Sequence, residues 1–354
     1  MYGQTPSEYL RENYKGVGFW NPTKIFSHEV DKKIHRMDLN ECPHPPSPKV
    51  LEAIQSAAVA LNRYPDGTCP DLTARLADAN GVPGENICFG SGSTQLLTAI
   101  AEISVGPGEQ LIAPEIIWRR FQGVFQVVAA DVTSVPNKFD GAIDVDGMIA
   151  AVGNNTKLVI VLTPNNPTGW VIDRKQQRAV LDFCREKGLW IISDEVYSRI
   201  IYDQNLAPSF LEIAEPKDLV IVVNSFSKSW AMTGWRMGWV TGPPHLTPVI
   251  EKLNEYNVAS PSSVAQHAGI TAIRDGEKFV ASMVGRYRLA RDVIHQRLGS
   301  MSKVHMPKPA AAFYAFFSVD GVTDSRHFAK KLMHETKVGL APGAAFGAGG
   351  EHYL

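Results

Sequence analysis

The sequence is poor in cysteine, in net charge and in long apolar runs, and each shortage excludes a class of protein. Its 354 residues include four cysteines, too few and too far apart for a disulfide framework or for the closely spaced pairs of a zinc site. Positive and negative side chains number 35 and 36, so the net charge is −1 and we expect neither nucleic acid nor an anionic membrane as a partner. Apolar runs such as 158–162 fall far short of the ~20 residues that span a bilayer.

Two further signals are missing. The ten histidines show neither H-x-x-x-H nor H-E-x-x-H spacing, so we predict no metal site. The start of the sequence lacks the cationic segment and apolar centre of a signal peptide. We therefore expect a cytoplasmic protein of enzyme size that binds no metal ion.

Short apolar runs alternate with helical periodicity through the first two thirds of the sequence. The strands expected from these runs are 86–89, 110–113, 158–162, 189–192 and 219–223. Fully apolar short strands that alternate with helices are typical of a parallel sheet covered on both faces, so we predict an α/β fold. Outside these strands, we expect helices at 49–61, 262–273, 279–298 and 326–335, and a strand at 312–319.

The length predicts more than one domain. At ~150 residues per domain, 354 residues correspond to between two and three units. We expect a large domain over 46–280. The segments 1–45 and 281–354 are expected to pack together as a smaller domain, with the N-terminal segment returning to lie beside the C-terminal part.

Polar side chains directly follow four of the predicted strands. In an open parallel sheet, ligands bind outside the carboxyl ends of the strands, so we expect these side chains to share one cleft. The four segments are Gly90-Ser91-Gly92-Ser93-Thr94, Thr163-Pro164-Asn165-Asn166-Pro167-Thr168-Gly169, Ser193-Asp194-Glu195-Val196-Tyr197 and Asn224-Ser225-Phe226-Ser227-Lys228.

The first of these segments predicts an anion site. It is small and glycine-rich, and it precedes a predicted helix whose N-terminus offers unpaired N–H donors and a positive dipole end, for which phosphate is a natural ligand. Ser225 and Arg236 can add a hydroxyl and a guanidinium to the same anion. An ordinary tight turn is the alternative interpretation.

Lys228 and Asp194 predict the chemistry. Both follow apolar strands, and burial lowers the pKa of a lysine and makes its amine nucleophilic, which Schiff-base chemistry requires. A buried carboxylate such as that of Asp194 needs a cationic partner. Pyridoxal 5′-phosphate meets these demands together, because it has a phosphate, a carbonyl and a ring nitrogen that can be protonated. We expect Glu195 to point to the opposite face of its strand and to be structural.

These motifs resemble those of the class I/II aminotransferases, which have the fold type I architecture of aspartate aminotransferase. The similarity depends on Asn165–Gly169, Ser193–Tyr197, Ser225–Lys228 and Gly234-Trp235-Arg236-Met237-Gly238, in this order and at the family's spacing. It implies a fold type I pyridoxal-phosphate enzyme, with a mostly parallel sheet and a smaller α+β domain. It also implies transfer of an amino group from an amino acid to a 2-oxo acid in two half-reactions.

The resemblance implies a role for each matching residue. Lys228 would form the Schiff base (the internal aldimine) with the cofactor and shuttle a proton, and Asp194 would pair with the pyridine nitrogen. Asn166 and Tyr197 would bind the phenolic oxygen. The phosphate would be held by Ser93, Thr94, Ser225 and Arg236.

Two aromatic residues have roles that the resemblance also implies. Trp118 would stack on the cofactor ring, although it follows Pro114 by two residues more than is usual in the family. Tyr64 would reach the phosphate in the neighbouring subunit, which makes the expected active unit a homodimer. Tyr14, Phe19 and Trp20 can line the substrate entrance, as N-terminal segments do in related enzymes.

The motifs do not identify the substrate or the exact reaction. Leu39–Pro43 and Arg63–Pro65 are similar to histidinol-phosphate aminotransferases, whereas Ala231–Arg236 is similar to aspartate and aromatic aminotransferases. The family's carboxylate-binding arginine follows a glycine-rich stretch like 342–350, and we expect it in a C-terminal tail beyond Leu354. The alternatives are a lyase, cyclase or decarboxylase that uses the same cofactor, or a non-catalytic binding module.

Overall fold

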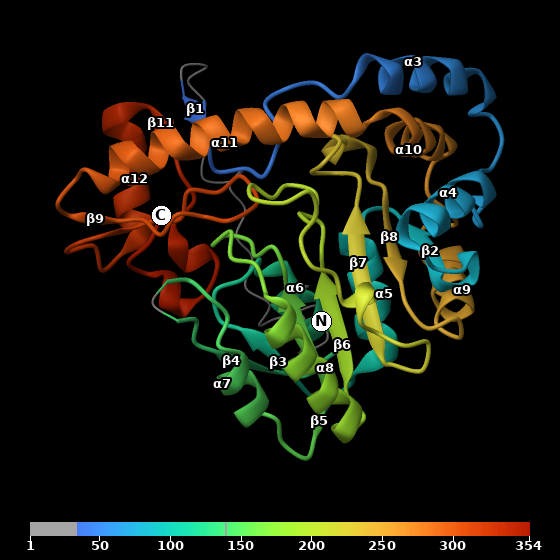
Figure 1. The fold of residues 1–354 in the computed structure, drawn as a ribbon, viewed down its shortest axis with the longest axis horizontal. Coiled ribbons are helices and arrows are strands. Elements are labelled where there is room, and N and C mark those ends of the chain that lie inside the picture. Colours follow the sequence, from blue (N-terminus) through green and yellow to red (C-terminus); the bar gives the residue numbers. More distant parts are fainter. Residues whose placement is uncertain (1–33, 139) are drawn as a thin grey trace, which may run out of the picture.

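A seven-stranded sheet with helices on both faces forms the centre of the computed structural model, which describes residues 34–138 and 140–354 (Figure 1). β8 is antiparallel to its neighbours β2 and β7, and all other neighbouring strands of this sheet are parallel. The predicted α/β fold is therefore confirmed. In spatial order the strands are β2 (Ile87–Gly90), β8 (Gly238–Thr241), β7 (Val220–Ser225), β6 (Trp190–Asp194), β5 (Thr156–Leu162), β3 (Gln110–Pro114) and β4 (Asp131–Val135).

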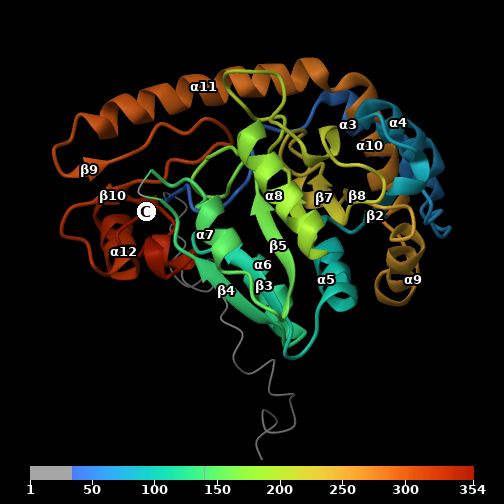
Figure 2. The ribbon, with the colours of Figure 1, turned by 60° about the horizontal axis from the view of Figure 1, so that its bottom comes forward.

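Two apolar cores cover the two faces of the sheet, as successive side chains of β5 illustrate. Leu158 and Ile160 pack into one core and Val159 and Val161 into the other, because neighbouring residues of a strand point to opposite faces. Burial on both faces explains why these strands are apolar throughout. The first core is completed by α5 (Ser93–Ser104), α6 (Arg120–Val127) and α9 (Thr247–Asn257), and the second by α7 (Val145–Ala150) and α8 (Arg174–Lys187) (Figure 2).

A third core packs against one face of β2 and β8, at the edge of the sheet. Phe226, Trp230 and Trp239 pack there against α3 (Pro48–Ala57), α4 (Pro70–Asn80) and α10 (Ser263–Asp275). Phe226 and Trp230 flank Lys228 in the sequence and are both buried. This core therefore fixes the chain on either side of the lysine.

The C-terminal part is joined to the N-terminal segment. Helix α11 (Glu277–Gly299) runs from α10 across one side of the molecule toward α12 (Ser325–Thr336) (Figures 1 and 2). β1 (His35–Arg36) pairs in parallel with β11 (Val338–Gly339), and β9 (Val304–His305) pairs with β10 (Ser318–Val319). The domain boundaries at residues 45 and 280 stay a prediction.

The five expected strands are present as β2, β3, β5, β6 and β7, with ends that differ by up to two residues. The strand expected at 312–319 is wrong for most of its length, because only Ser318–Val319 forms one. Ala312 has a φ of 60°, which breaks an extended chain, and the adjacent Phe313 and Tyr314 both pack against Tyr197 rather than alternating. β4 and β8 were not expected.

No helix in the described part of the chain is both long and apolar enough to cross a membrane. The longest, α11, has 23 residues and is interrupted by charged side chains along its length.

Candidate active site

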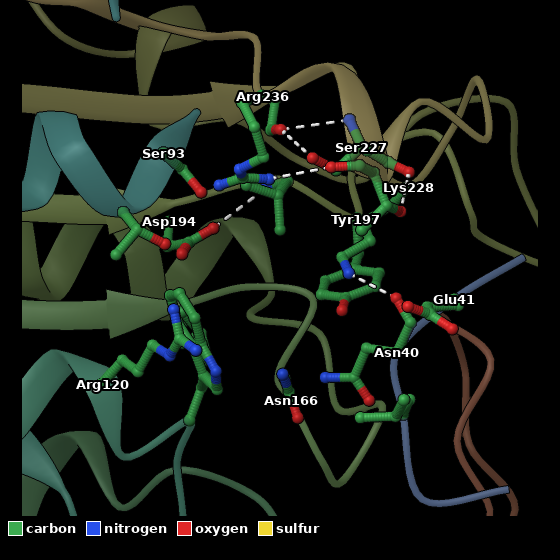
Figure 3. Close-up of a pocket in the computed structure, with 18 residues that line it drawn as sticks. Asn40, Glu41, Ser93, Arg120, Asn166, Asp194, Tyr197, Ser227, Lys228 and Arg236 are labelled. Atoms are coloured by element: carbon green, nitrogen blue, oxygen red, sulfur yellow. Dashed lines mark hydrogen bonds between the residues drawn. The ribbon is translucent and has the colours of Figure 1, made fainter. Parts of the chain in front are cut away.

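A cavity of about 500 Å³ lies at the carboxyl ends of β5, β6 and β7, where an open parallel sheet binds its ligands (Figure 3). The structure brings together nine of the ten residues predicted for the site. They are Ser93, Thr94, Trp118, Asn166, Asp194, Tyr197, Ser225, Lys228 and Arg236. Tyr64 does not line the cavity; its side chain is 94% exposed.

The loop between β2 and α5 is shaped to approach an anion. Gly92 has a φ of 83°, and a Cβ atom on it would lie 2.4 Å from Nη2 of Arg236. A Cβ on Gly238 of the adjacent β8 would lie 2.8 Å from the backbone nitrogen of Ser93. Two glycines therefore allow the first turn of α5 and the guanidinium of Arg236 to meet at one end of the cavity.

Hydroxyl groups extend this end of the cavity. The Ser225 and Ser227 side chains are hydrogen bonded, with Oγ atoms 2.8 Å apart, and the Ser227 N–H donates to Oγ of Ser225 at 3.1 Å. Arg236 has a φ of 54° and donates from Nη1 to the carbonyl of Thr233 at 3.0 Å. Partial burial and the nearby Arg120 lower the pKa of Arg236. Hydroxyl donors, a cation and a helix N-terminus at one place are well suited to a phosphate.

Lys228 points into the middle of the cavity. Its Nζ donates to the backbone carbonyl of Asn40 at 2.5 Å, so the N-terminal segment holds the amine (Figure 3). Burial, followed by repulsion from Arg236, lowers the pKa of Lys228 to about 8. An amine with this pKa is largely neutral in mildly alkaline solution, which makes it a nucleophile.

Asp194 ends β6 beside the same cavity and is 2% exposed. Its Oδ1 accepts a hydrogen bond from the Val196 N–H at 3.1 Å, and no cationic side chain in the described ranges forms an ion pair with it. Burial raises the pKa of Asp194 to about 7. A protonated ring nitrogen placed against it would favour the ionised carboxylate.

Glu195 lies away from this cavity. Its Oε1 accepts from Oγ of Ser193 at 2.9 Å and from the Phe210 N–H at 3.1 Å, and burial raises the pKa of Glu195 to about 7. It does not line the cavity, and its structural role stays a prediction.

Tyr197 faces the cavity from the loop after β6, and Asn166 faces it from the loop after β5. The Tyr197 hydroxyl is hydrogen bonded to that of Tyr314, a residue of the C-terminal part, and burial raises the pKa of both phenols. Oδ1 of Asn166 is buried without a partner among the described residues. An unsatisfied buried polar atom at the wall of a cavity marks a position where a ligand can complete the hydrogen bonding.

Several residues that line the cavity were not predicted to belong to the site. Ser227 and Thr233 lie in or beside the motifs quoted above. Their closeness in the sequence to Lys228 and Arg236 could have indicated that they line the cavity. Asn40 contributes a backbone carbonyl, for which sequence carries no signal. Glu41 and Arg120 bring two further charges to the cavity. Tyr14, Phe19 and Trp20 lie outside the described residues.

Together these side chains can anchor a phosphate at one end, present a neutral amine at the centre and hold a cationic ring nitrogen against a carboxylate. Trp118 provides an aromatic wall.

Similar chains are found among the aminotransferases. A family model described as aminotransferase class I and II matches residues 32–353. The aspartate aminotransferase of Pyrococcus horikoshii is 30% identical over 275 residues, 76% of this chain and 70% of that protein. A probable N-acetyl-LL-diaminopimelate aminotransferase of Bacillus subtilis is 31% identical over 287 residues, 79% of this chain and 71% of that protein. The crystal structure of an aromatic aminotransferase from Pyrococcus horikoshii has a TM-score of 0.84 at 27% identity, over 93% of this chain and 92% of that one.

The lowered pKa of Lys228 predicts an unusual pH dependence for its acylation. In protein free of small ligands, labelling of Lys228 by an amine-acylating reagent is expected to be half-maximal near pH 8, because only the neutral amine reacts. Exposed lysines, with pKa values near 10.4, should label at higher pH. Peptide mass spectrometry across a pH series measures both profiles.

The Arg236→Gln variant provides a second test of the Lys228 labelling profile. Removal of this positive charge should move the Lys228 profile to higher pH, because the ammonium form is then repelled less. A Lys228 profile that coincides with those of exposed lysines would contradict the account.

Proposed function

Because the chain belongs to the aminotransferase class I and II family, it is an enzyme that transfers amino groups, and we propose that it does so with pyridoxal 5′-phosphate. The family is generally dependent on this cofactor. The residues around the cavity fit it, because a glycine-shaped anion cradle and a buried carboxylate that forms no ion pair with the described residues face one space. The single observation that supports the proposal most strongly is the presence of Lys228 and Asp194 in one cavity.

Each residue has a proposed role toward the cofactor. Ser93, Thr94, Ser225 and Arg236 bind the phosphate, Trp118 stacks on the ring, and Asn166 and Tyr197 donate hydrogen bonds to the phenolic oxygen. Asp194 keeps the ring nitrogen protonated, since a buried carboxylate is stabilised by a cation at hydrogen-bond distance. Lys228 provides the amine that attaches the cofactor.

When bound, pyridoxal phosphate supplies a carbonyl that condenses with amines and a ring that withdraws electrons from the substrate Cα. With the cofactor bound, the Lys228 amine would hold and move the proton that leaves the substrate Cα. Its pKa of about 8 suits this exchange near neutral pH. Tyr197, held by the hydroxyl of Tyr314, keeps its own hydroxyl directed at the cavity.

The proposed substrates are an amino acid and a 2-oxo acid, and the proposed active unit is a homodimer in the cytoplasm in which Tyr64 reaches the neighbouring site. Tyr64 is 94% exposed, Val59 is 87% exposed and Leu61 is 50% exposed. Apolar side chains exposed close together are typical of a surface covered by a partner.

A half-reaction tests the transfer directly. With the cofactor bound and no 2-oxo acid present, an amino acid is expected to convert the aldehyde form to the pyridoxamine form, which absorbs at shorter wavelength. Conversion should be stoichiometric and reversed by a 2-oxo acid. Elimination or decarboxylation products with the aldehyde form retained would instead support the lyase, cyclase or decarboxylase alternatives.

The Asp194→Asn variant tests the role of the buried carboxylate. We expect the half-reaction to slow on the order of a hundredfold or more, because a preorganised charge acts mainly in the transition state. Cofactor affinity should fall much less, because the phosphate contacts are intact. Glu195→Gln, a neighbouring buried carboxyl group outside the cavity, is the matched control and should retain nearly the wild-type rate. Equal losses of rate and affinity in Asp194→Asn would contradict the proposed role.

A further inference from the structure

The glycine-rich stretch near the end of the sequence has no part in the roles proposed above, yet it packs against the chain that leads to Trp118. Residues 343–350 of this stretch, here called the glycine loop, form two short 3-10 turns, η6 (Gly343–Ala345) and η7 (Ala348–Gly350). Residues 115–117, here called the approach segment, connect the end of β3 to Trp118. The two segments are far apart in the sequence and are in direct contact in the structure.

Hydrogen bonds hold the approach segment from two directions. The backbone N–H groups of its first two residues donate to oxygen atoms at and just beyond the end of β4, each at 2.8 Å. The third N–H, that of Ile117, donates to the carbonyl of Phe346 at 3.1 Å. The last hydrogen bond before Trp118 therefore comes from the glycine loop and not from the sheet.

Two glycines allow this close approach. Gly347 is buried and has a φ of 153°, and a Cβ atom on it would collide with the backbone carbonyl oxygen of Glu115. A Cβ atom on the exposed Gly349 would lie 2.7 Å from Oε2 of Glu115. The carboxylate belongs to a flexible side chain and can move aside, whereas the carbonyl oxygen moves only with the approach segment. Gly347 is therefore the position at which the two segments fit most tightly.

The glycine loop is itself held firmly. Its ends meet, because a Cβ atom on Gly343 or on Gly350 would collide with the carbonyl oxygen of the other. The N–H of Ala344 donates to Oγ of the buried Ser325 at 3.2 Å, and that Oγ donates to Oε2 of Glu351 at 3.1 Å. Tightly packed groups transmit a displacement instead of absorbing it. A change in the loop is therefore passed on to the approach segment.

We propose that Gly347 is a positioning residue that fixes the approach segment and thereby sets the orientation in which Trp118 faces the cofactor ring. The inference rests on the proposed function, since it concerns the aromatic wall of the same cavity. No residue of the glycine loop lines that cavity, so the effect is exerted through Trp118. Aromatic stacking depends on the distance and the orientation of the rings, so a small displacement of the backbone weakens it.

A double-mutant cycle with Gly347→Ala and Trp118→Ala in the cofactor-loaded protein tests the proposal. Three quantities are measured: the affinity for pyridoxal phosphate, the visible circular dichroism of the bound cofactor, and the single-turnover rate of the half-reaction with an amino acid that the wild type converts. Gly321→Ala is the matched control. Gly321 also lies in the C-terminal part and has a φ of 83°, but no atom of the described residues lies within 4 Å of a Cβ placed there. It reproduces the backbone strain without the contact.

We expect Gly347→Ala to slow the half-reaction on the order of tenfold or more and to alter the circular dichroism, because the ring wall is misplaced. In the Trp118→Ala background, the same substitution should change the rate by less than about twofold, since no ring is left to position. Gly321→Ala should leave all three quantities unchanged.

Phe346→Ala provides a second cycle that does not require Gly347→Ala to fold. The Phe346 ring packs edge to face on Phe316 and is only half-buried, so the fold should tolerate its loss. The carbonyl that holds Ile117 is then less firmly placed. We expect a slower half-reaction when Trp118 is present and no further slowing in the Trp118→Ala background.

Equal slowing with and without Trp118 would overturn the inference, because the glycine loop would then act on the fold as a whole. A loss in Gly321→Ala as large as that in Gly347→Ala would overturn it too, and so would a Trp118→Ala variant that reacts like the wild type. Wild-type protein that binds no pyridoxal phosphate or converts no amino acid would instead count against the proposed function. The two failures are therefore distinguishable.

Discussion

The site depends on one physical constraint. An amine and a carboxylate are both buried beside the same cavity, largely out of contact with water. Burial lowers the pKa of Lys228 and raises that of Asp194, so each group is pushed toward its neutral form. Neither has an oppositely charged side chain in ion-pair contact in the described part of the chain. A ligand that reacts with the amine and places a cation against the carboxylate satisfies both groups at once.

The fold positions these two groups by simple means. Parallel strands bring the ends of β5, β6 and β7 to one edge, and a core of aromatic side chains fixes the chain around Lys228. The segments from outside the central sheet then complete the cavity, since Asn40 holds the lysine amine and Tyr314 holds the Tyr197 hydroxyl. The two residues come from parts of the chain joined by the β1–β11 pair. A shift of that pair relative to the sheet would alter Lys228 and Tyr197 together.

Much of this arrangement was predictable, because its signals are local. Apolar strands followed by polar segments predicted the fold and the cleft, and four motifs indicated the family, which the comparisons confirm. Nine predicted residues line one cavity, while their individual roles stay predictions.

The rest depends on contacts between distant residues. The Asn40 carbonyl and the Tyr314 hydroxyl meet partners more than 100 positions away, and no periodicity indicates such pairs. The left-handed Ala312 interrupts what looked like a strand. Arg120 resembles any exposed arginine of a helix until the cavity is seen beside it.

Reduction by borohydride tests the central claim most directly. The protein is loaded with pyridoxal phosphate, reduced, digested and mapped by mass spectrometry, with Lys228→Ala treated in parallel. The account predicts a phosphopyridoxyl group on the wild-type peptide that contains Lys228. In the Lys228→Ala variant, no other peptide should carry the group at a comparable level. A label on a different lysine, or none in the wild-type protein, would contradict it.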